Sequence, residues 1–531
     1  MTHAKERPAP RYRGSEQNDP EGRFANEAIT LRARRSATSA KLMFGVWGRV
    51  SPHSQRNKIV PKSESFCAFW LGVNGATVGR RVSAKPKSAE AQKSRVGGMG
   101  ASPPLGIGAE MKIFGIFLDR EKNTENGLTI ALPTPERVAV PLPQDGIAEV
   151  KVGQWVLTGS RLCGGSLPAH ASVSGKVEEI KEFVTDDGSF TAVVIKADEN
   201  QKNAAVKVPR ADDRESFINA VRESGCPAAE KIAAAFNADM LIVNGIESEQ
   251  YVTSENRCML DDGQLITAGI TLISRLMGIE KTVIAVASDC EEAIDAMEKT
   301  AADAPNCEVV KVRPDHPAGA DMVLVNNVAG RPIKANETAA EKKVLILLPS
   351  DVAFIAGYFE TGMPFIKRRV TVDGDLVKTP CVAEAPIGTP LKELFAFADG
   401  NLQPAEKMVI GGLMTGRSVT DPELPLGKCD SAALIFMKPL ESGGKGSLKV
   451  TSGQTNCIRC GRCVKACPAG LMPMRIEKAV NKKKHTELRR LRPDLCIGCG
   501  SCTYVCPAKR ELKDAVDKAK AILERKGGDE I

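Results

Sequence analysis

Aromatic residues and long apolar runs are what this sequence has least of. Phe, Trp and Tyr make up 4% of the 531 residues, so its cores have to be built from Val, Ile, Leu, Ala and Met. The absence of any run of about eighteen apolar residues predicts that no helix spans a membrane. The N-terminal stretch is polar and lacks the apolar core of a signal peptide. We therefore expect a cytoplasmic protein, peripheral to a membrane complex at most, that contacts membranes only through partner proteins.

Positive charge is concentrated at the N-terminal end. The chain has a net charge of +8, yet residues 1–110 alone hold 19 Lys and Arg against 8 Asp and Glu. The rest of the chain is therefore slightly acidic, which argues against nucleic-acid binding by the whole protein. Residues 1–110 also lack sustained hydrophobic periodicity. Two interpretations stay open for them, an untranslated gene-model extension upstream of Met111 or a basic tail of low order, and we assign them no function.

Downstream of Met111 the pattern changes several times. Short alternating strands with turns at Gly153 and Gly159 predict a β-rich barrel-sandwich. Buried strands then alternate with amphipathic helices, which indicates a parallel sheet covered by helices. Two strands around a Gly-Asp turn, followed by a helix, predict a β-grasp-like module, so the fold class is multidomain α/β. The predicted parts are the extension (1–110), the barrel-sandwich (111–207), the α/β domain (208–365), the β-grasp-like module (366–440), a cysteine-rich domain (450–515) and a C-terminal surface helix or tail (516–531).

Eight of the sixteen cysteines lie in two nearly identical runs, "CIRCGRCVKACP" and "CIGCGSCTYVCP". Without a secretory signal, this spacing indicates metal ligands rather than disulfides. It is the spacing of bacterial two-cluster ferredoxins, in which the fourth cysteine of each run ligates the other cluster. Three thiolates on one tight loop reach three irons of a cubane, and the fourth iron faces the other run. We predict two [4Fe–4S] clusters, cluster one on Cys457, Cys460, Cys463 and Cys506, and cluster two on Cys496, Cys499, Cys502 and Cys467.

Two alternatives concern this cysteine-rich region. A pair of zinc sites is the first, but structural zinc is usually held by two separated CxxC pairs, which the duplicated runs do not resemble. The second concerns the basic segment 475–494 between the runs. It is either a solvated helix face or linker, or a docking patch that steers an acidic electron partner.

Further motifs precede the cysteine runs in a fixed order: "AHASVSGKV" (169–177), "VNGIESEQYVTSENRCM" (243–259), "HPAG" (316–319), "GMPFIKRRVTVDGD" (362–375), "APIGTPLKELF" (385–395) and "GGLMTG" (411–416). With the cysteine runs they resemble the RnfC family, the peripheral electron-input subunit of the Rnf complex. The resemblance covers about 128–515. It implies a barrel, a domain like the NADH- and flavin-binding subunit of respiratory complex I, a β-grasp (soluble ligand-binding) domain and a two-cluster ferredoxin-like domain.

The resemblance also implies cofactors. NADH would pass a hydride to FMN, which releases its electrons singly to the clusters. Asn244, Glu247 and Glu249 would lie at the flavin. The family has a glycine-rich loop before this strand, but here the loop is shortened to "SGCPAAEK" and keeps only Gly225, which puts NADH oxidation and FMN binding in doubt. Cys226 in this loop is either a redox thiol with a pKa lowered by a helix N-terminus, or an ordinary buried cysteine.

The leading hypothesis is an RnfC-type electron-transfer protein. It would relay electrons from NADH or a reduced carrier through two [4Fe–4S] clusters to an Rnf-type complex or to proline reductase. The altered loop and Cys226 suggest the soluble branch of the family, the proline-reductase-associated electron transfer protein. The alternative is a flavin-free adaptor between two redox proteins, with Cys226 as a redox thiol, and a redox sensor is a third hypothesis. The sequence leaves open whether the chain oxidises NADH itself.

Overall fold

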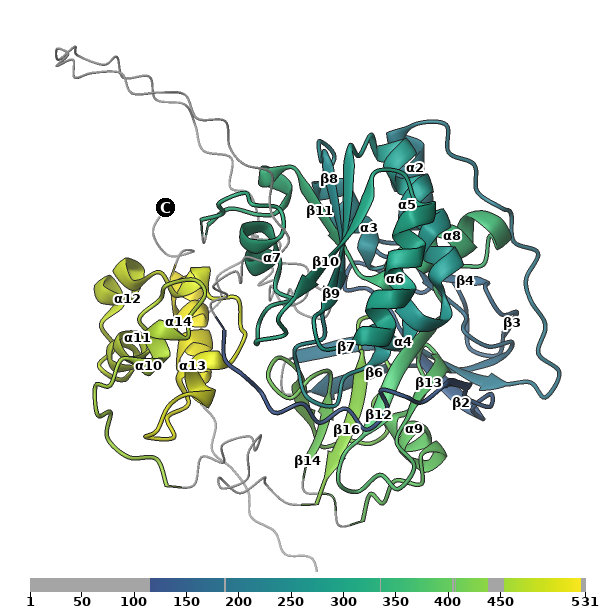
Figure 1. Ribbon diagram of the computed structural model, residues 1–531. Helices are drawn as coiled ribbons and strands as arrows, with labels where there is room; N and C mark the ends of the chain where they lie inside the picture. The colour runs from purple at the N-terminus through teal and green to yellow at the C-terminus, as the bar shows by residue number, and fades with distance from the viewer. Residues whose placement is uncertain are drawn as a thin grey trace, which may run out of the picture. The chain divides into compact units, whose positions relative to one another are not determined.

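Figure 1 shows a computed structural model of the chain, which describes residues 115–185, 188–334, 336–403, 405, 407–437 and 453–526. The predicted N-terminal extension lies outside the described residues. Within the described ranges, no helix combines the length and the apolar character needed to cross a bilayer.

The β-rich scaffold consists of two small antiparallel sheets around one aliphatic core. Alternate strand residues turn inward, and Val138, Val193 and Ile195 are fully buried. Gly153 and Gly159 both have φ of +89°, as expected for the predicted turns. The larger sheet has the order β2-β7-β6-β3 and the smaller pairs β4 with β5: β2 (Arg137–Pro141), β3 (Trp155–Val156), β4 (Arg161–Cys163), β5 (Ala169–His170), β6 (Gly175–Thr185) and β7 (Gly188–Ala197).

The α/β domain has a parallel sheet, as predicted, and its four strands lie in the order β10-β9-β8-β11. Alternate residues of β8 face two different cores. Leu241 and Val243 pack with α2, α3, α5, α6 and α8, whereas Met240 and Ile242 pack with α7 on the other face (Figure 1). The elements are α2 (Arg214–Glu223), α3 (Ala228–Ala234), β8 (Met240–Gly245), α4 (Ser254–Asp261), α5 (Gly263–Met277), β9 (Lys281–Ala287), α6 (Glu291–Asp303), β10 (Cys307–Val312), α7 (Asp321–Asn327), η1 (Ala340–Lys342), β11 (Val344–Leu347) and α8 (Pro349–Thr361).

A six-stranded mixed sheet, β1-β13-β12-β16-β14-β15, forms the β-grasp-like module together with α9. Its edge strand β1 (Thr129–Ala131) pairs in parallel with β13, so a strand that we had assigned to the barrel-sandwich belongs to this sheet. Local pattern cannot reveal a pairing between segments so far apart in sequence. The other elements are β12 (Lys367–Asp373), β13 (Cys381–Pro386), α9 (Leu391–Phe397), β14 (Lys407–Ile410), β15 (Arg417–Val419) and β16 (Ala432–Phe436).

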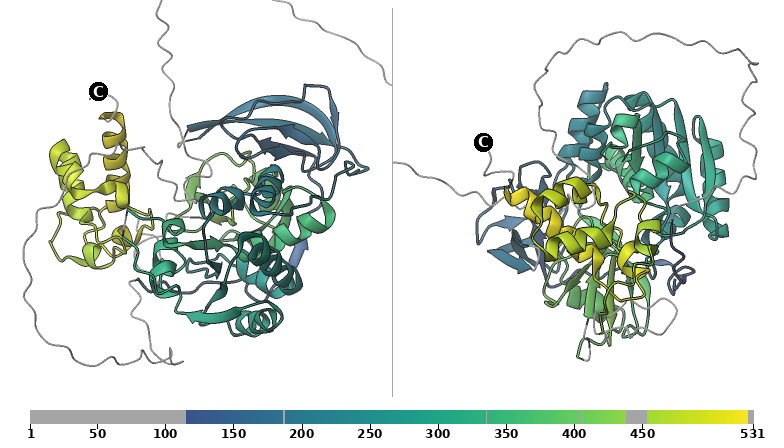
Figure 2. Two further views of the ribbon diagram at one scale, coloured as in Figure 1. Left: turned by 90° about the horizontal axis from the view of Figure 1, so that it is seen from above. Right: turned by 90° about the vertical axis from the view of Figure 1, so that its left-hand side faces the viewer.

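The cysteine-rich region is a small helical domain whose helices are yellow-green to yellow in Figure 2. Its last helix has one face exposed and one buried, since Val516 and Ala519 pack against Ile476 and Leu488 of the segment between the runs. The apolar residues of that helix recur on one face, and this face completes the core of the domain. The elements are α10 (Arg462–Lys465), α11 (Pro473–Asn481), α12 (His485–Leu491), η2 (Pro493–Leu495), α13 (Ser501–Tyr504) and α14 (Leu512–Lys526).

Candidate iron-sulfur sites and the flavin-type region

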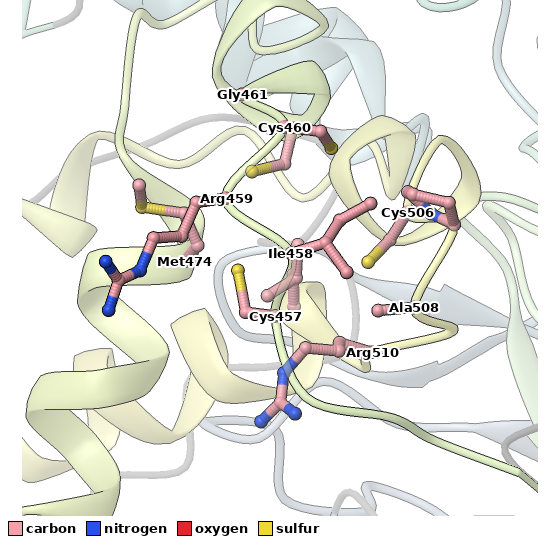
Figure 3. A pocket seen from close by; sticks show the side chains of 12 residues that line it. Cys457, Ile458, Arg459, Cys460, Gly461, Met474, Cys506, Ala508 and Arg510 are labelled. Atoms are coloured by element: carbon pink, nitrogen blue, oxygen red, sulfur yellow. The ribbon is translucent and has the colours of Figure 1, made fainter.

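The four cysteines predicted for cluster one surround a single cavity. Cys457, Cys460 and Cys463 of the first run line it together with Cys506 of the second run. The cavity is open on one side, and the space between its lining atoms amounts to about 350 Å³ when the solvent-filled part is included. Figure 3 shows the sulfur atoms of Cys457, Cys460 and Cys506 around this common space. This arrangement fits a cubane cluster, since the ligands lie around a volume and the fourth one comes from the other run.

Each cysteine loop leads directly into a one-turn helix. The helices α10 and α13 start after Gly461 and Gly500, whose φ angles of +75° and +72° favour glycine. The turn lets the backbone reverse between the second and third cysteines of a run. Three thiols of one run are thereby brought to one side of the loop.

The four cysteines predicted for cluster two also lie near one another. The pKa of the Cys499 thiol is raised to about 11, mainly by burial and to a smaller extent by the neighbouring Cys496 and Cys467, while hydrogen bonds with Ser501 oppose the shift. Burial likewise raises the pKa of Cys502, with smaller contributions from the same neighbours and Cys499. Thiolates buried this close together need compensating positive charge, which iron would supply. The donor set therefore fits a cluster here as well.

Hydrogen bonds reach the sulfur atoms of cluster two. The backbone N–H of Leu471 donates to Cys467 Sγ and that of Gly498 to Cys496 Sγ, both at 3.4 Å. Such bonds are one of the means by which a protein sets the potential of an iron–sulfur cluster.

The second cysteine run also contacts the α/β domain and the β-grasp-like module. The buried His316 places its Nε2 2.7 Å from the backbone oxygen of Cys499. Because a carbonyl oxygen only accepts, Nε2 carries the hydrogen, and Nδ1 is left to accept from the Ser248 hydroxyl at 3.3 Å. A Cβ built on Gly500 would lie 2.9 Å from the backbone oxygen of Met414. The sequence reveals neither contact, because both join residues far apart in the chain.

The three residues assigned to the flavin all have polar partners inside the chain. Asn244 donates from Nδ2 to the Gly319 oxygen at 2.9 Å and accepts the backbone N–H of Ile246. The Glu247 carboxylate accepts the first backbone N–H groups of α4, at 2.9 and 3.0 Å. The Glu249 carboxylate accepts the backbone N–H groups of Met414 and Thr415 and the Thr415 hydroxyl.

The loop "SGCPAAEK", which stands where the family has its glycine-rich segment, is tightly packed at Gly225 and Cys226. Gly225 has φ of +72°, and a Cβ built there would lie 2.3 Å from the Pro168 oxygen of the scaffold. Cys226 is fully buried in the core of the α/β domain. Burial raises the pKa of its thiol well above the ordinary value, with a smaller contribution from Asp351. Of the two interpretations of Cys226, these observations favour the ordinary buried cysteine, because desolvation outweighs the nearby start of α3.

Sequence reasoning missed a buried carboxyl in the same region. Glu255, in the first turn of α4, is 5% exposed and accepts hydrogen bonds from the backbone N–H and the hydroxyl of Ser350. Burial raises its pKa to about 7, although Arg368 opposes the shift. The nearest Arg368–Glu255 nitrogen–oxygen distance is 3.9 Å. No local pattern points to this residue, since the burial of a glutamate at a helix start depends on what packs over it.

Comparison with known proteins assigns three parts of the chain. Residues 113–200 match the RnfC barrel sandwich hybrid domain, residues 214–353 the Nuo51 FMN-binding domain and residues 456–509 a 4Fe-4S dicluster domain. The C subunit of the proton-translocating ferredoxin:NAD(+) oxidoreductase complex of Clostridium ljungdahlii is 30% identical over 380 residues, which are 67% of this chain and 81% of that protein. The chain belongs to the RnfC family.

Two further members of the RnfC family agree. The C subunit of the Na(+)-translocating ferredoxin:NAD(+) oxidoreductase complex of Acetobacterium woodii is 29% identical over 365 residues, 64% of this chain and 81% of that protein. The C subunit of the ion-translocating oxidoreductase complex of Rhodobacter capsulatus is 28% identical over 381 residues, 66% of this chain and 71% of that protein. These matches confirm the predicted family, the barrel-sandwich, the α/β domain of the FMN-binding type and the two-cluster domain.

The family supports FMN as a cofactor type of the α/β domain, but the predicted flavin residues fit that role poorly. The polar atoms of Asn244, Glu247 and Glu249 that would hold a flavin already have partners within the chain. At Gly225 the backbone approaches the scaffold instead of leaving a cradle for a phosphate.

Proposed function

We propose that this RnfC-family chain is an electron-transfer iron–sulfur protein, which carries electrons through two [4Fe–4S] clusters to a partner protein. The convergence of Cys457, Cys460 and Cys463 with Cys506 around one cavity supports this proposal most directly. A [4Fe–4S] cluster carries one electron at a time, so two clusters in one small domain act as a conductor rather than as a catalytic site. The donor is NADH or a reduced carrier.

The partner is a redox protein. The relatives above are named as subunits of ion-translocating oxidoreductase complexes, and we propose either a subunit of such a complex or proline reductase as the acceptor. The chain would act in the cytoplasm and reach a membrane only through those partners.

A flavin-free adaptor is a second candidate function. It is favoured by the internal partners of Asn244, Glu247 and Glu249 and by the close packing at Gly225. In this form another protein feeds electrons to the clusters, and the α/β domain serves as a scaffold. Cys226 is fully buried, and burial raises the pKa of its thiol well above the ordinary value, which disfavours the reactive thiolate.

One anaerobic experiment tests both forms. The full chain is purified under argon, and iron, acid-labile sulfide and flavin are quantified before NADH is added in the same cuvette. About eight irons per chain are expected for either form. Flavin together with bleaching by NADH would establish the NADH-oxidising form, whereas clusters without flavin and without a response to NADH would establish the adaptor. Iron near zero or near two per chain would refute the proposal.

A further inference from the structure

The two cysteine loops are exposed to very different degrees. In the first run Cys457 and Cys460 are exposed, and Ile458 between them is 65% exposed. In the second run the equivalent Cys499 is 8% exposed, and Ile497 is 38% exposed. Cluster one is therefore the one whose ligands reach the surface. Because electron tunnelling slows steeply with distance, an electron passes to another protein most readily at such a face.

The domain that carries this loop is strongly basic. Residues 453–526 hold 18 Lys and Arg against 7 Asp and Glu, a net charge of +11. Residues 111–452 hold 36 Lys and Arg against 48 Asp and Glu, a net charge of −12. The slightly acidic total downstream of residue 110 thus conceals two regions of opposite sign. A positive domain next to an acidic region attracts acidic proteins to one place.

The immediate surroundings of Ile458 combine an apolar centre with a basic rim. Arg459, Arg462 and Lys465 are exposed on the same loop and on α10. In Figure 3 the guanidinium group of Arg459 points away from the cavity. A protruding apolar side chain within a charged rim is the usual anatomy of a specific but transient protein interface.

We propose that the face formed by residues 457–465 is a docking surface for an acidic electron-transfer protein. This inference rests on the proposed function and adds the place and the chemistry of the partner. Ile458 would make the central apolar contact, and the basic rim would steer the partner and fix its orientation. One electron would pass between cluster one and the redox centre of the partner, so that one centre is oxidised as the other is reduced and no bond is made or broken.

The test measures binding of the full, cluster-loaded chain to an acidic [2Fe–2S] ferredoxin immobilised on a sensor, at low and high salt. The variant Arg459→Glu/Arg462→Glu reverses two rim charges, and Lys151→Glu/Lys176→Glu makes the same charge change on exposed residues of the scaffold. We expect the rim variant to raise Kd at low salt by about tenfold or more and the scaffold variant to change it by less than about twofold. Ile458→Ser should raise Kd at high salt as well, because the apolar contact is not screened.

Three outcomes would overturn the proposal. If the rim and scaffold variants weakened ferredoxin binding equally, the attraction would be an unspecific one to the net positive charge of the chain. Weakening by Lys482→Glu/Lys483→Glu alone would place the partner on the segment between the cysteine runs. Tighter binding of basic cytochrome c than of ferredoxin to the unaltered chain would refute an acidic partner. Iron content and cluster absorbance are measured for every variant and for the unaltered chain. Absence of clusters from the unaltered chain would refute the proposed function itself rather than the docking surface.

Discussion

The two cysteine runs are almost the same sequence in two different environments. Gly461 and Gly500 occupy equivalent positions with nearly the same φ, yet nothing described lies within 4 Å of a Cβ built on Gly461, whereas one built on Gly500 meets Met414. Likewise, the backbone oxygen of Cys499 accepts a hydrogen bond from His316. The spacing of the cysteines therefore specifies which cluster forms, and the neighbouring domains specify how far it is from solvent.

The flavin-type region of the α/β domain contributes to the covering of the second cysteine run. Glu249 binds the backbone of Met414, whose oxygen in turn lies against Gly500 of the second run. Ser248 lies against His316, which reaches Cys499. The motif that we had assigned to a flavin thus supports the contact with cluster two, while the loop of cluster one is left to solvent.

The largest expected effect separates the two ligand sets. Because Cys506 serves cluster one, Cys506→Ala/Cys460→Ala should keep one intact cluster and about four irons per chain. Cys506→Ala/Cys499→Ala should lose both clusters. Iron and sulfide analysis of anaerobically reconstituted protein measures the difference. The reverse result would mean that each run ligates its own cluster without crossing.

The buried carboxyl of Glu255 predicts that the stability of the folded chain depends on pH. The raised pKa of Glu255 means that the folded state holds its proton up to about pH 7, whereas the unfolded chain releases it near the ordinary 4.5. Stability that is present below pH 4.5 is therefore lost as the pH rises towards 7. Glu255→Gln, which stays neutral, should gain up to about 3 kcal/mol relative to the unaltered chain between these pH values.

Urea unfolding followed by circular dichroism at several pH values measures this gain. The exposed Glu199→Gln serves as the control and should show no comparable gain. A gain that does not depend on pH would show that Glu255 is ionised in the folded protein throughout the range.

A matched pair of glycines tests the buried and the open loop directly. Gly461→Ala should cost about 1 kcal/mol, since alanine tolerates a positive φ poorly. Gly500→Ala should cost this amount and more, because its Cβ would clash with the Met414 oxygen at 2.9 Å. The urea concentration at which cluster absorbance is lost measures both. Equal costs would mean that the contact with Met414 does not constrain the loop.

The smallest expected effect concerns a single hydrogen bond. His316→Phe removes the donor to the Cys499 oxygen, a contribution of about 1 kcal/mol. We expect iron chelators to attack cluster two faster, with no change for cluster one. Electron paramagnetic resonance of the partly chelated protein distinguishes the two clusters. The control is His485→Phe, which changes a histidine at the start of α12 in the cysteine-rich domain itself. Faster loss of cluster one instead would contradict the assignment of His316 to the second run.

Much of the fold was predictable because its signals are local. The β8 pattern, all apolar up to Asn244, indicated a strand buried on both faces, and Gly278 ends α5 in the left-handed conformation that favours glycine. Local signals do not show which distant segments of the chain meet. Thr129–Ala131 pairs with a strand about 250 residues away, and α14 completes a core that no segment of the domain closes alone.

The sequence alone determined the ligand chemistry of this protein, because the short, fixed spacing of the cysteines indicates the cluster type without knowledge of the fold. It also determined the alternation of strands and helices in the α/β domain, because burial repeats with the period of each element. Only the tertiary structure decided that Cys226 is buried, that the flavin motif binds its own chain and that one cysteine loop is covered. These properties depend on which distant surfaces meet, and a side chain's pKa, partners and exposure follow from its neighbours in space rather than in sequence.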